Sequence, residues 1–146
     1  MNQEAITRAS GIINSKQDYV GGGMDGFVVL SLIDEQGHPT SSAITLSKSD
    51  GIKWLSFLGG TGSNKAKRIK NCNKAGVNIS TSGYNITLVG TIETLIDPAK
   101  KKPHWQDVFT ENHGAIDCPD HCAFLFTTER YSIYFADDNS VAEGTL

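Results

Sequence analysis

The fold of this 146-residue chain is decided by residues 57–65, FLGGTGSNK. A segment predicted to be a strand over residues 52–58 runs here through a glycine-rich turn into a helix predicted over residues 66–72. Ser63 is the predicted N-cap, because its hydroxyl can accept hydrogen bonds from the free amides of the first helical turn. Those amides, the helix dipole and the ammonium of Lys65 together favour an anion. The stretch therefore predicts a phosphate-binding turn.

The hydroxyl of Thr61 adds a further donor to this turn. The turn is not a P-loop, because the spacing G-x-x-x-x-G-K-S/T is absent. Taken alone, the same residues also suit an ordinary glycine turn followed by a capped helix. The segments on either side are needed to decide between these interpretations.

Strands are predicted on both sides of the turn, because short β-branched or alternating apolar segments are typical of strands. They cover residues 27–33, 41–47, 52–58, 77–80, 84–96, 122–127 and 131–135. Turns are predicted at residues 34–37 and 49–51, where Asp and Gly tolerate tight backbone geometry. Gly90 predicts a bend or bulge within its long strand.

Helices are predicted at the start of the chain and late in it. The first covers residues 3–15 and is followed by Gly21–Gly23, which end any regular element. The last begins after Asp97 and Pro98, a cap and a first-turn proline, and carries Trp105, Val108 and Phe109. Lys100–Lys102 is interpreted as a solvated helix start, and the polar tail after Asp137 as mobile.

These elements predict one domain over residues 1–146. Consecutive hairpins favour an antiparallel sheet, and many short strands favour closure into a barrel. The expected fold is mainly β with flanking helices, an antiparallel split β-barrel of six to seven strands.

Charge and composition exclude several classes of function. The chain has 13 basic and 16 acidic residues, a net charge of -3, which gives no general attraction to nucleic acid or an anionic membrane. The longest uncharged apolar stretch, residues 26–33, is too short to span a bilayer. The first ten residues lack an apolar signal region, and three cysteines make no disulfide framework. We therefore expect reduced thiols and a cytoplasmic location.

The order of motifs resembles the pyridoxamine-phosphate-oxidase-like family of FMN-binding split barrels, and within it the general stress protein 26 subgroup. The family's pattern is an aromatic strand, a short loop, Ser-x-Lys opening a helix, a Val-x-Leu-Ser-like strand, and a strand glycine before an acidic-Pro turn. The matching stretches are residues 57–59, 63–65, 77–80, 89–91 and 97–98. Each motif is loose, but their order and spacing together are specific, and the resemblance covers about residues 26–135.

The resemblance implies FMN as cofactor and a homodimer with the cofactor site at the subunit interface. Lys65 would contact the FMN phosphate with Ser63 and Asn64 beside it, and Asn85 takes the place of a Gln that reaches the partner's flavin. Strand ends that flank the flavin ring and ribityl chain supply the other residues. The full implied set is Ser42, Ala43, Ile44, Thr45, Leu58, Gly59, Ser63, Asn64, Lys65 and Asn85.

Three departures from the family pattern bear on activity. The family's oxidase has an Arg on the strand that here reads Ser41-Ser42-Ala43, a Thr where Gly59 stands, and a C-terminal Arg segment for the substrate phosphate. Pyridoxamine phosphate oxidase activity itself is therefore not expected. FMN supplies its own redox chemistry, so the protein need only bind, orient and shield it. No catalytic residue is assigned.

Two further hypotheses stand beside a redox flavoprotein acting on an unidentified small molecule or a reduced nicotinamide. One is a non-enzymatic stress protein that binds flavin or haem, since related split barrels bind haem or deazaflavin. The other is a metal-stabilised interaction module built on His113, Cys118, His121 and Cys122. The favoured interpretation of that cluster is loop polarity and core packing, with no metal site.

Overall fold

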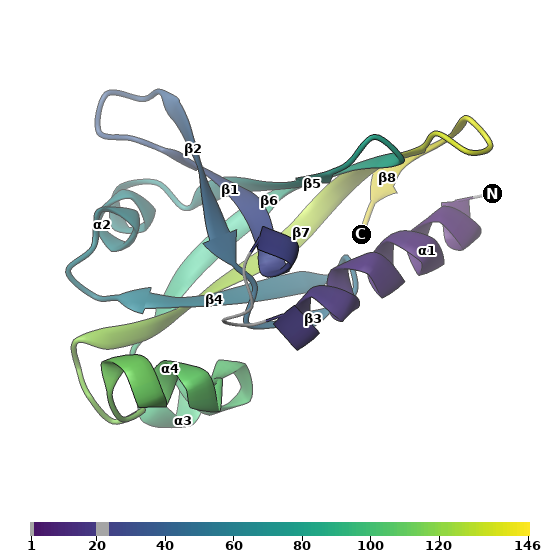
Figure 1. Cartoon of the computed structure of the whole chain (residues 1–146). Helices are drawn as coiled ribbons and strands as arrows, with labels where there is room; N and C mark the ends of the chain where they lie inside the picture. Colours follow the sequence, from purple (N-terminus) through teal and green to yellow (C-terminus); the bar gives the residue numbers. More distant parts are fainter. Residues whose placement is uncertain (1, 20–23) are drawn as a thin grey trace.

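A single antiparallel sheet, curled into a half-barrel, forms the body of this computed structural model, which describes residues 2–19 and 24–146 (Figure 1). Within these residues the strands are β1 (Phe27–Ile33), β2 (Pro39–Thr45), β3 (Lys48–Asp50), β4 (Trp54–Gly60), β5 (Lys74–Ser80), β6 (Tyr84–Leu95), β7 (His121–Phe135) and β8 (Ser140–Thr145). Their order is β2-β1-β5-β6-β7-β4-β3, with β8 also paired to β7. The predicted fold class is confirmed, with eight strands in place of six to seven.

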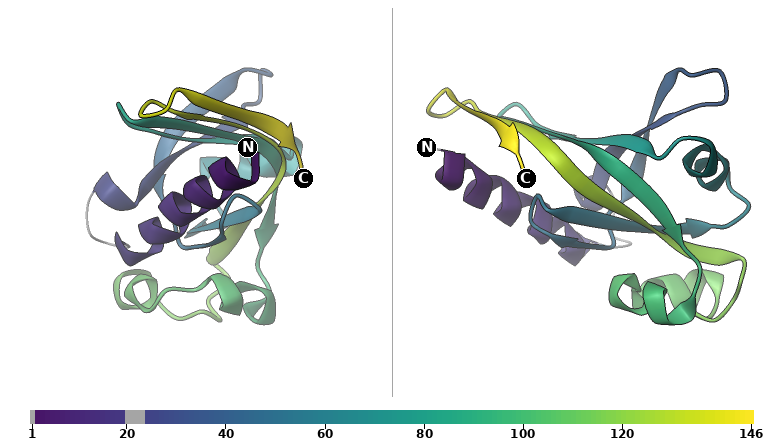
Figure 2. Two further views of the ribbon diagram at one scale, coloured as in Figure 1. Left: turned by 90° about the vertical axis from the view of Figure 1, so that its right-hand side faces the viewer. Right: turned by 180° about the vertical axis from the view of Figure 1, so that it is seen from behind.

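Helices flank the sheet on one side and at its ends (Figure 2). They are α1 (Asn2–Ser15), α2 (Asn64–Asn71), α3 (Pro98–Lys101) and α4 (Asp107–His113), with 3-10 turns η1 (Lys16–Tyr19), η2 (Met24–Gly26) and η3 (Lys102–His104). The Asp97 cap is confirmed, since its carboxylate accepts from the Ala99 amide at 2.9 Å. The helix predicted after it is divided into α3, η3 and α4. The predicted Gly21–Gly23 break lies outside the described residues.

The core fills the concave side of the sheet and is closed by α1. Ala5, Ala9 and Ile13 recur at helical spacing and are buried against it. The core strands contribute alternate residues, as in β1, where Val28, Leu30 and Leu32 are buried. Burial of this one face of each element is the main force that holds the half-barrel closed.

Residues 121–135 form one strand, so the predicted division into two strands, residues 122–127 and 131–135, joined by a short turn, is wrong. The polar side chains between these segments lie at a bulge, where the pairing of β6 with β7 shifts between Val89 and Gly90. A Cβ atom at Gly90 would collide with the carbonyl oxygen of Thr127. The bulge predicted at Gly90 is therefore confirmed, and only glycine fits there.

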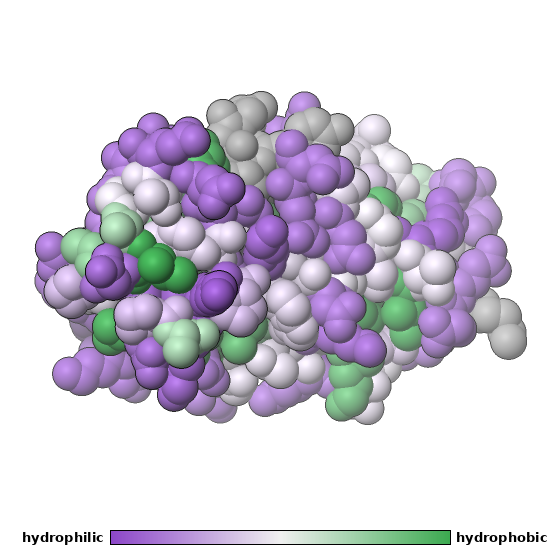
Figure 3. Space-filling model, turned by 90° about the horizontal axis from the view of Figure 1, so that it is seen from below, coloured by the Kyte–Doolittle hydropathy of each residue, from purple (hydrophilic) through white to green (hydrophobic). Residues whose placement is uncertain are grey.

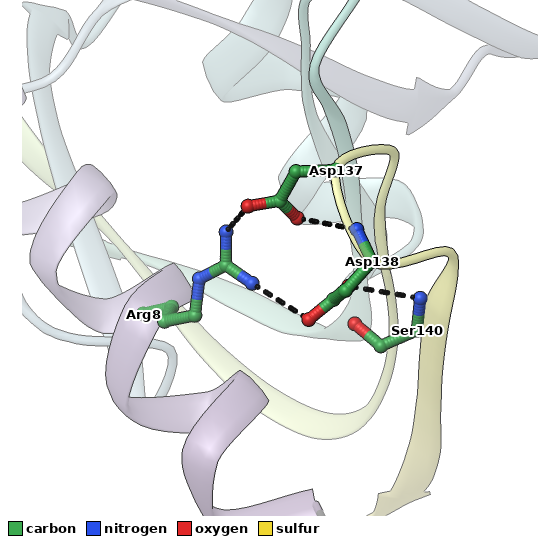
Figure 4. A network of polar contacts seen from close by, with 4 residues as sticks. All are labelled: Arg8, Asp137, Asp138 and Ser140. Carbon is green, nitrogen blue, oxygen red and sulfur yellow. Dashed lines mark hydrogen bonds and ion pairs between the residues drawn. The ribbon is translucent and has the colours of Figure 1, made fainter.

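The tail predicted to be mobile forms the edge strand β8 instead. Arg8 of α1 pairs with Asp137 at 3.0 Å and with Asp138 at 3.4 Å in the turn before it (Figure 4). Its guanidinium also lies 3.7 Å from the centre of the Phe135 ring. Hydrogen bonds from Ser140, and then the charge of Arg8, lower the pKa of Asp138. The tail is thus tied to the first helix.

Both boundaries of β4 differ from the predicted strand over residues 52–58, since β4 begins at Trp54. Strand β4 ends at Gly60, two residues later than predicted, so Gly59 and Gly60 belong to the strand and not to the turn. Among the described residues, no helix is both long and apolar enough to cross a membrane.

Candidate functional site

An open pocket of about 380 Å³ lies between β2, β4 and α4. This volume falls within the range of small-molecule sites. Its lining consists of Phe27, Ala43, Ile44, Thr45, Leu46, Ser47, Leu58, Gln106, Val108, Phe109, Asn112 and His113. Seven of these come from the strands and the turn after β2, and five from the segment around α4. The pocket is therefore built where the two edges of the half-barrel approach each other.

Four residues predicted from the sequence line this pocket together: Ala43, Ile44, Thr45 and Leu58. They come from two strands that are not hydrogen-bonded neighbours, so only the curl of the sheet brings them together. Ser42 precedes them on β2 and is exposed, and it does not line the pocket.

Gly59, which follows the lining residue Leu58 on β4, does not line the pocket itself. It pairs with Cys122 of β7, and a Cβ atom there would lie 2.7 Å from Cε2 of Phe124. Phe124 is buried in the core. The departure from the family's threonine thus has a packing reason, because the Phe124 ring occupies the space.

The turn into α2 carries three further predicted residues. Ser63 is confirmed as the N-cap, since its hydroxyl accepts from the Ala66 amide at 3.2 Å. Among the described residues, the amides of Gly62, Asn64 and Lys65 donate to no protein acceptor. Helix α2 has four basic residues and no acidic one. Free amides and positive charge make this helix end suited to an anion.

Thr61 does not contribute to that turn as predicted. Its amide donates to the Asp120 carbonyl at 2.9 Å, and its hydroxyl donates to the Pro119 carbonyl at 3.1 Å. Both donors are therefore used to hold the loop before β7, and neither is free for a ligand.

Asn85 lies away from the pocket, at the start of β6. Its carboxamide oxygen accepts from Asn78 Nδ2 at 2.7 Å and from Ser80 Oγ at 2.8 Å. In register it stands opposite Ser80 on β5 and Tyr134 on β7. It is exposed on the convex face of the sheet.

The wall formed by α4 was not predicted from the sequence. Phe109 contacts three aromatic rings: Trp105 at 5.0 Å, His113 at 4.5 Å and His121 at 5.4 Å between centroids. Trp105, for which the sequence favours packing in the core, is half-buried and lies in this aromatic cluster outside the hydrophobic core. The signal that could have identified the wall is the spacing of residues 108, 109 and 112, which share one helical face.

On the surface seen from below, apolar groups are small and scattered among polar ones (Figure 3).

The base of this wall is held by Lys101, which is fully buried. Its ammonium donates to the carbonyls of His121 at 3.0 Å and Cys118 at 3.3 Å, and lies 5.4 Å from the centre of the Trp105 ring. The prediction that residues 100–102 are all solvated is wrong for Lys101. Sequence composition could not reveal this, because its carbonyl partners are backbone groups 17 and 20 residues away.

A second anchor joins the same segment to the strands. Gln106 Nε2 donates to the Ser47 carbonyl at 2.6 Å, and the Ser47 hydroxyl donates to the His104 carbonyl. The His104 ring packs edge-on against Trp54 of β4 at 5.2 Å. Burial lowers the pKa of His104.

The His-Cys cluster forms no metal centre within the part of the chain that the structure describes, where no three potential ligand side chains converge. His121 Nε2 donates to the His113 carbonyl at 2.6 Å. The Cys122 thiol is buried and donates to the Gly59 carbonyl at 3.6 Å, and burial raises its pKa to about 11. Cys122 thus serves the core, as the favoured interpretation has it.

No protein-family model and no curated protein matches the chain. Solved structures do match it. A protein related to general stress protein 26, of the pyridoxinephosphate oxidase family, from Clostridium acetobutylicum has 26% identity and a TM-score of 0.72, over 94% of this chain and 96% of that chain.

Two further structures share the fold at lower identity. A pyridoxamine 5'-phosphate oxidase-related, FMN-binding protein from Nostoc punctiforme PCC 73102 has 13% identity and a TM-score of 0.64, covering 98% of this chain and 95% of its own. A heme binding protein from Mycobacterium smegmatis has 14% identity and a TM-score of 0.64, covering 92% and 57%. The predicted family resemblance is confirmed by these matches.

Proposed function

We propose that this chain, which has the split-barrel fold of the pyridoxamine-phosphate-oxidase-like proteins and resembles their general stress protein 26 subgroup, binds FMN. The observation that carries the proposal is the pocket at β2 and β4, which contains Ala43, Ile44, Thr45 and Leu58. Its volume and its mixture of apolar and polar lining suit a planar ring. The Nostoc relative that shares the fold is described as FMN-binding.

The residues at hand fit the two halves of FMN. The apolar side chains of Leu58, Val108 and Phe109 would face the flavin ring. The start of α2, with Ser63, Asn64 and Lys65, would hold the phosphate through free amides and a positive charge. When bound, FMN supplies electron and hydride transfer, and the protein binds, orients and shields it.

The chain is proposed to act as a homodimer through the convex face of the sheet. Three apolar side chains are exposed on that face: Val29 at 38%, Tyr134 at 37% and Val141 at 64%. Helix α1 lies on the opposite, concave side (Figure 2). A two-fold contact between convex faces would cover these side chains and bring Asn85 toward the partner's flavin.

The redox role is proposed to act on a small molecule or a reduced nicotinamide, in a cytoplasmic setting. Pyridoxamine phosphate oxidase activity is not proposed, because β2 carries no arginine among Ser41, Ser42 and Ala43. The second candidate is haem binding without catalysis, which the Mycobacterium relative of the same fold favours. His113 in the pocket wall offers an imidazole for such a ligand.

A titration of the purified protein with FMN, followed by flavin fluorescence and absorbance, tests the proposal. We expect saturable quenching with a Kd of about 1 μM or tighter, and weaker binding of riboflavin, which lacks the phosphate. Equal affinity for both flavins would contradict the phosphate site. A haem titration in parallel, with a Soret band as readout, decides between the two candidates.

Light scattering at micromolar concentration tests the homodimer. The expected mass is twice 15.7 kDa. Tyr134→Glu places a charge on the convex face and should shift the population toward monomer. A wild-type protein that binds FMN as a monomer would overturn the two-subunit site.

A further inference from the structure

Arg68 of α2 has an unusual set of contacts. Its Nη1 lies 3.4 Å from the hydroxyl of Thr40 on β2, a long hydrogen bond. Its Nε is buried and has no partner among the described residues. The nearest carboxylate, Glu35 Oε2 in the turn between β1 and β2, is 4.0 Å away from Nε. The Arg68 side chain is 28% exposed, and its buried Nε is left without a hydrogen-bond acceptor among the described residues.

A charged donor atom that is buried without an acceptor, as Nε of Arg68 is, costs free energy because neither water nor a protein group accepts from it. The adjacent acids do not satisfy Arg68. The Asp34 carboxylate already accepts from the amides of Gln36 and His38, and Glu35 is at the limit of an ion pair. Helix α2 itself carries no acid to compensate. A further anion is the group that would complete the set.

The position of Arg68 connects the two parts of the proposed site. On α2 it follows Asn64 by four residues and Lys65 by three, so these side chains lie on neighbouring parts of the helix surface. On β2 it contacts Thr40, which shares a strand face with Ser42, because alternate residues point the same way. Arg68 therefore lies between the capped turn and the strand that lacks an arginine.

We propose that Arg68 is the second cation for the FMN phosphate and that Glu35 competes with the phosphate for it. This proposal rests on the proposed function. The planar guanidinium offers two parallel donors to a phosphate, which a lysine cannot do. Glu35 holds Arg68 through charge alone at 4.0 Å, and a doubly charged phosphate would displace it.

The first test compares FMN and riboflavin affinity of the full chain with Arg68→Gln. FMN binding should weaken about 10- to 100-fold, the scale of a charged hydrogen bond, with riboflavin affinity unchanged. Arg68→Lys should restore only part of the loss. Lys67→Gln, an exposed neighbour on the same helix, is the control and should change FMN affinity less than about twofold.

The second test uses Glu35→Gln. Removing the competing carboxylate should strengthen FMN binding about two- to fivefold, and this gain should disappear in Glu35→Gln with Arg68→Gln. If Arg68 only ties the hairpin to α2, Glu35→Gln will lower Tm and leave FMN affinity unchanged, and the proposal is wrong.

The outcomes separate this proposal from the proposed function. A wild-type protein that binds neither flavin overturns both. A protein that binds FMN more tightly than riboflavin, with Arg68→Gln equal to wild type in both affinities, overturns only the role of Arg68. Equal weakening by Arg68→Gln and Lys67→Gln assigns the effect to diffuse charge and also overturns it.

Discussion

The two walls of the pocket are built in different ways. The wall formed by β2 and β4 belongs to the sheet, and Leu55 and Phe57 of β4 are completely buried beneath it. The wall formed by α4 contains no buried residue at all. It is held by Lys101, by the contact of Gln106 with Ser47, and by the ring of Phe109. One wall is fixed by the core and the other by a few polar and aromatic contacts.

The sheet wall therefore belongs to the part of the molecule that determines the fold, whereas the α4 wall can determine which ligand binds. The sheet wall cannot change without cost to the core, because its residues share strands with buried side chains. The α4 wall can change at little cost to global stability, because few buried apolar contacts depend on it. Substitutions in the sheet should therefore unfold the protein, and substitutions in α4 should mainly alter binding.

The largest effect is expected from Gly90→Ala, at the bulge that curls the sheet. The new Cβ would collide with the backbone of Thr127, which cannot move without breaking the pairing of β6 with β7. We expect a loss of about 3 kcal/mol or more in unfolding free energy, measured by urea denaturation. Gly11→Ala is the control, since no atom of the described residues lies within 4 Å of the added Cβ, and it should leave stability unchanged or slightly raised.

A smaller loss is expected from Lys101→Met, at the base of the α4 wall. The substitution keeps the apolar stem but leaves the carbonyls of Cys118 and His121 without their donor. Unfolding free energy should fall by about 2–3 kcal/mol, and FMN affinity should fall with it. Lys102→Met, which is exposed, should do neither. Wild-type stability of Lys101→Met would show that Lys101 does not hold this wall.

Most of the sheet could be predicted from the sequence because its signals are local. The alternation of apolar residues predicts the strand over residues 84–96, and the single glycine within it, Gly90, predicts the bulge. Strand β8 was missed because it is a polar edge strand with one buried residue, Ala142, and is fixed by Arg8 from the other end of the chain. Long-range contacts of this kind leave no local pattern.

In the candidate site, too, local features could be predicted from the sequence and long-range contacts could not. The cap at Ser63 follows from residue type and spacing, and the structure confirms it. The pocket lining at Gln106, Asn112 and His113 depends on where α4 packs, and that is fixed by Lys101 and Ser47 through backbone carbonyls. A backbone carbonyl partner can belong to any residue type, so the sequence does not mark it.

Binding should be more sensitive than stability at Phe109. Phe109→Ala removes a ring that lines the pocket and contacts Trp105, His113 and His121, none of which belongs to the hydrophobic core. We expect FMN affinity to fall about 5- to 10-fold, with a loss of no more than about 1 kcal/mol in stability. Phe124→Ala in the core should show the reverse order, with a loss of about 3–5 kcal/mol.

The smallest effect concerns the pH dependence of the α4 wall, through His104. His104 is 7% exposed, its Nδ1 has no hydrogen-bond partner in the part of the chain that the structure describes, and burial lowers its pKa below the ordinary value of 6.5. Below pH 6.5, His104 is therefore protonated in the unfolded chain but stays neutral in the folded chain. The free energy of unfolding consequently decreases as the pH falls toward the lowered pKa. Above that window the contribution is constant.

The measurement is Tm between pH 7 and pH 5 for wild type and His104→Phe, which keeps a ring against Trp54 but cannot titrate. The wild type should lose on the order of a degree or two more than the variant. Hydrogen exchange locates the effect, because amides of α4 should open at lower pH while those of β4 stay protected. If the amides of α4 and β4 exchange equally at low pH, or if Tm of the wild type and of His104→Phe depends equally on pH, His104 does not make the α4 wall more sensitive to pH than the sheet wall.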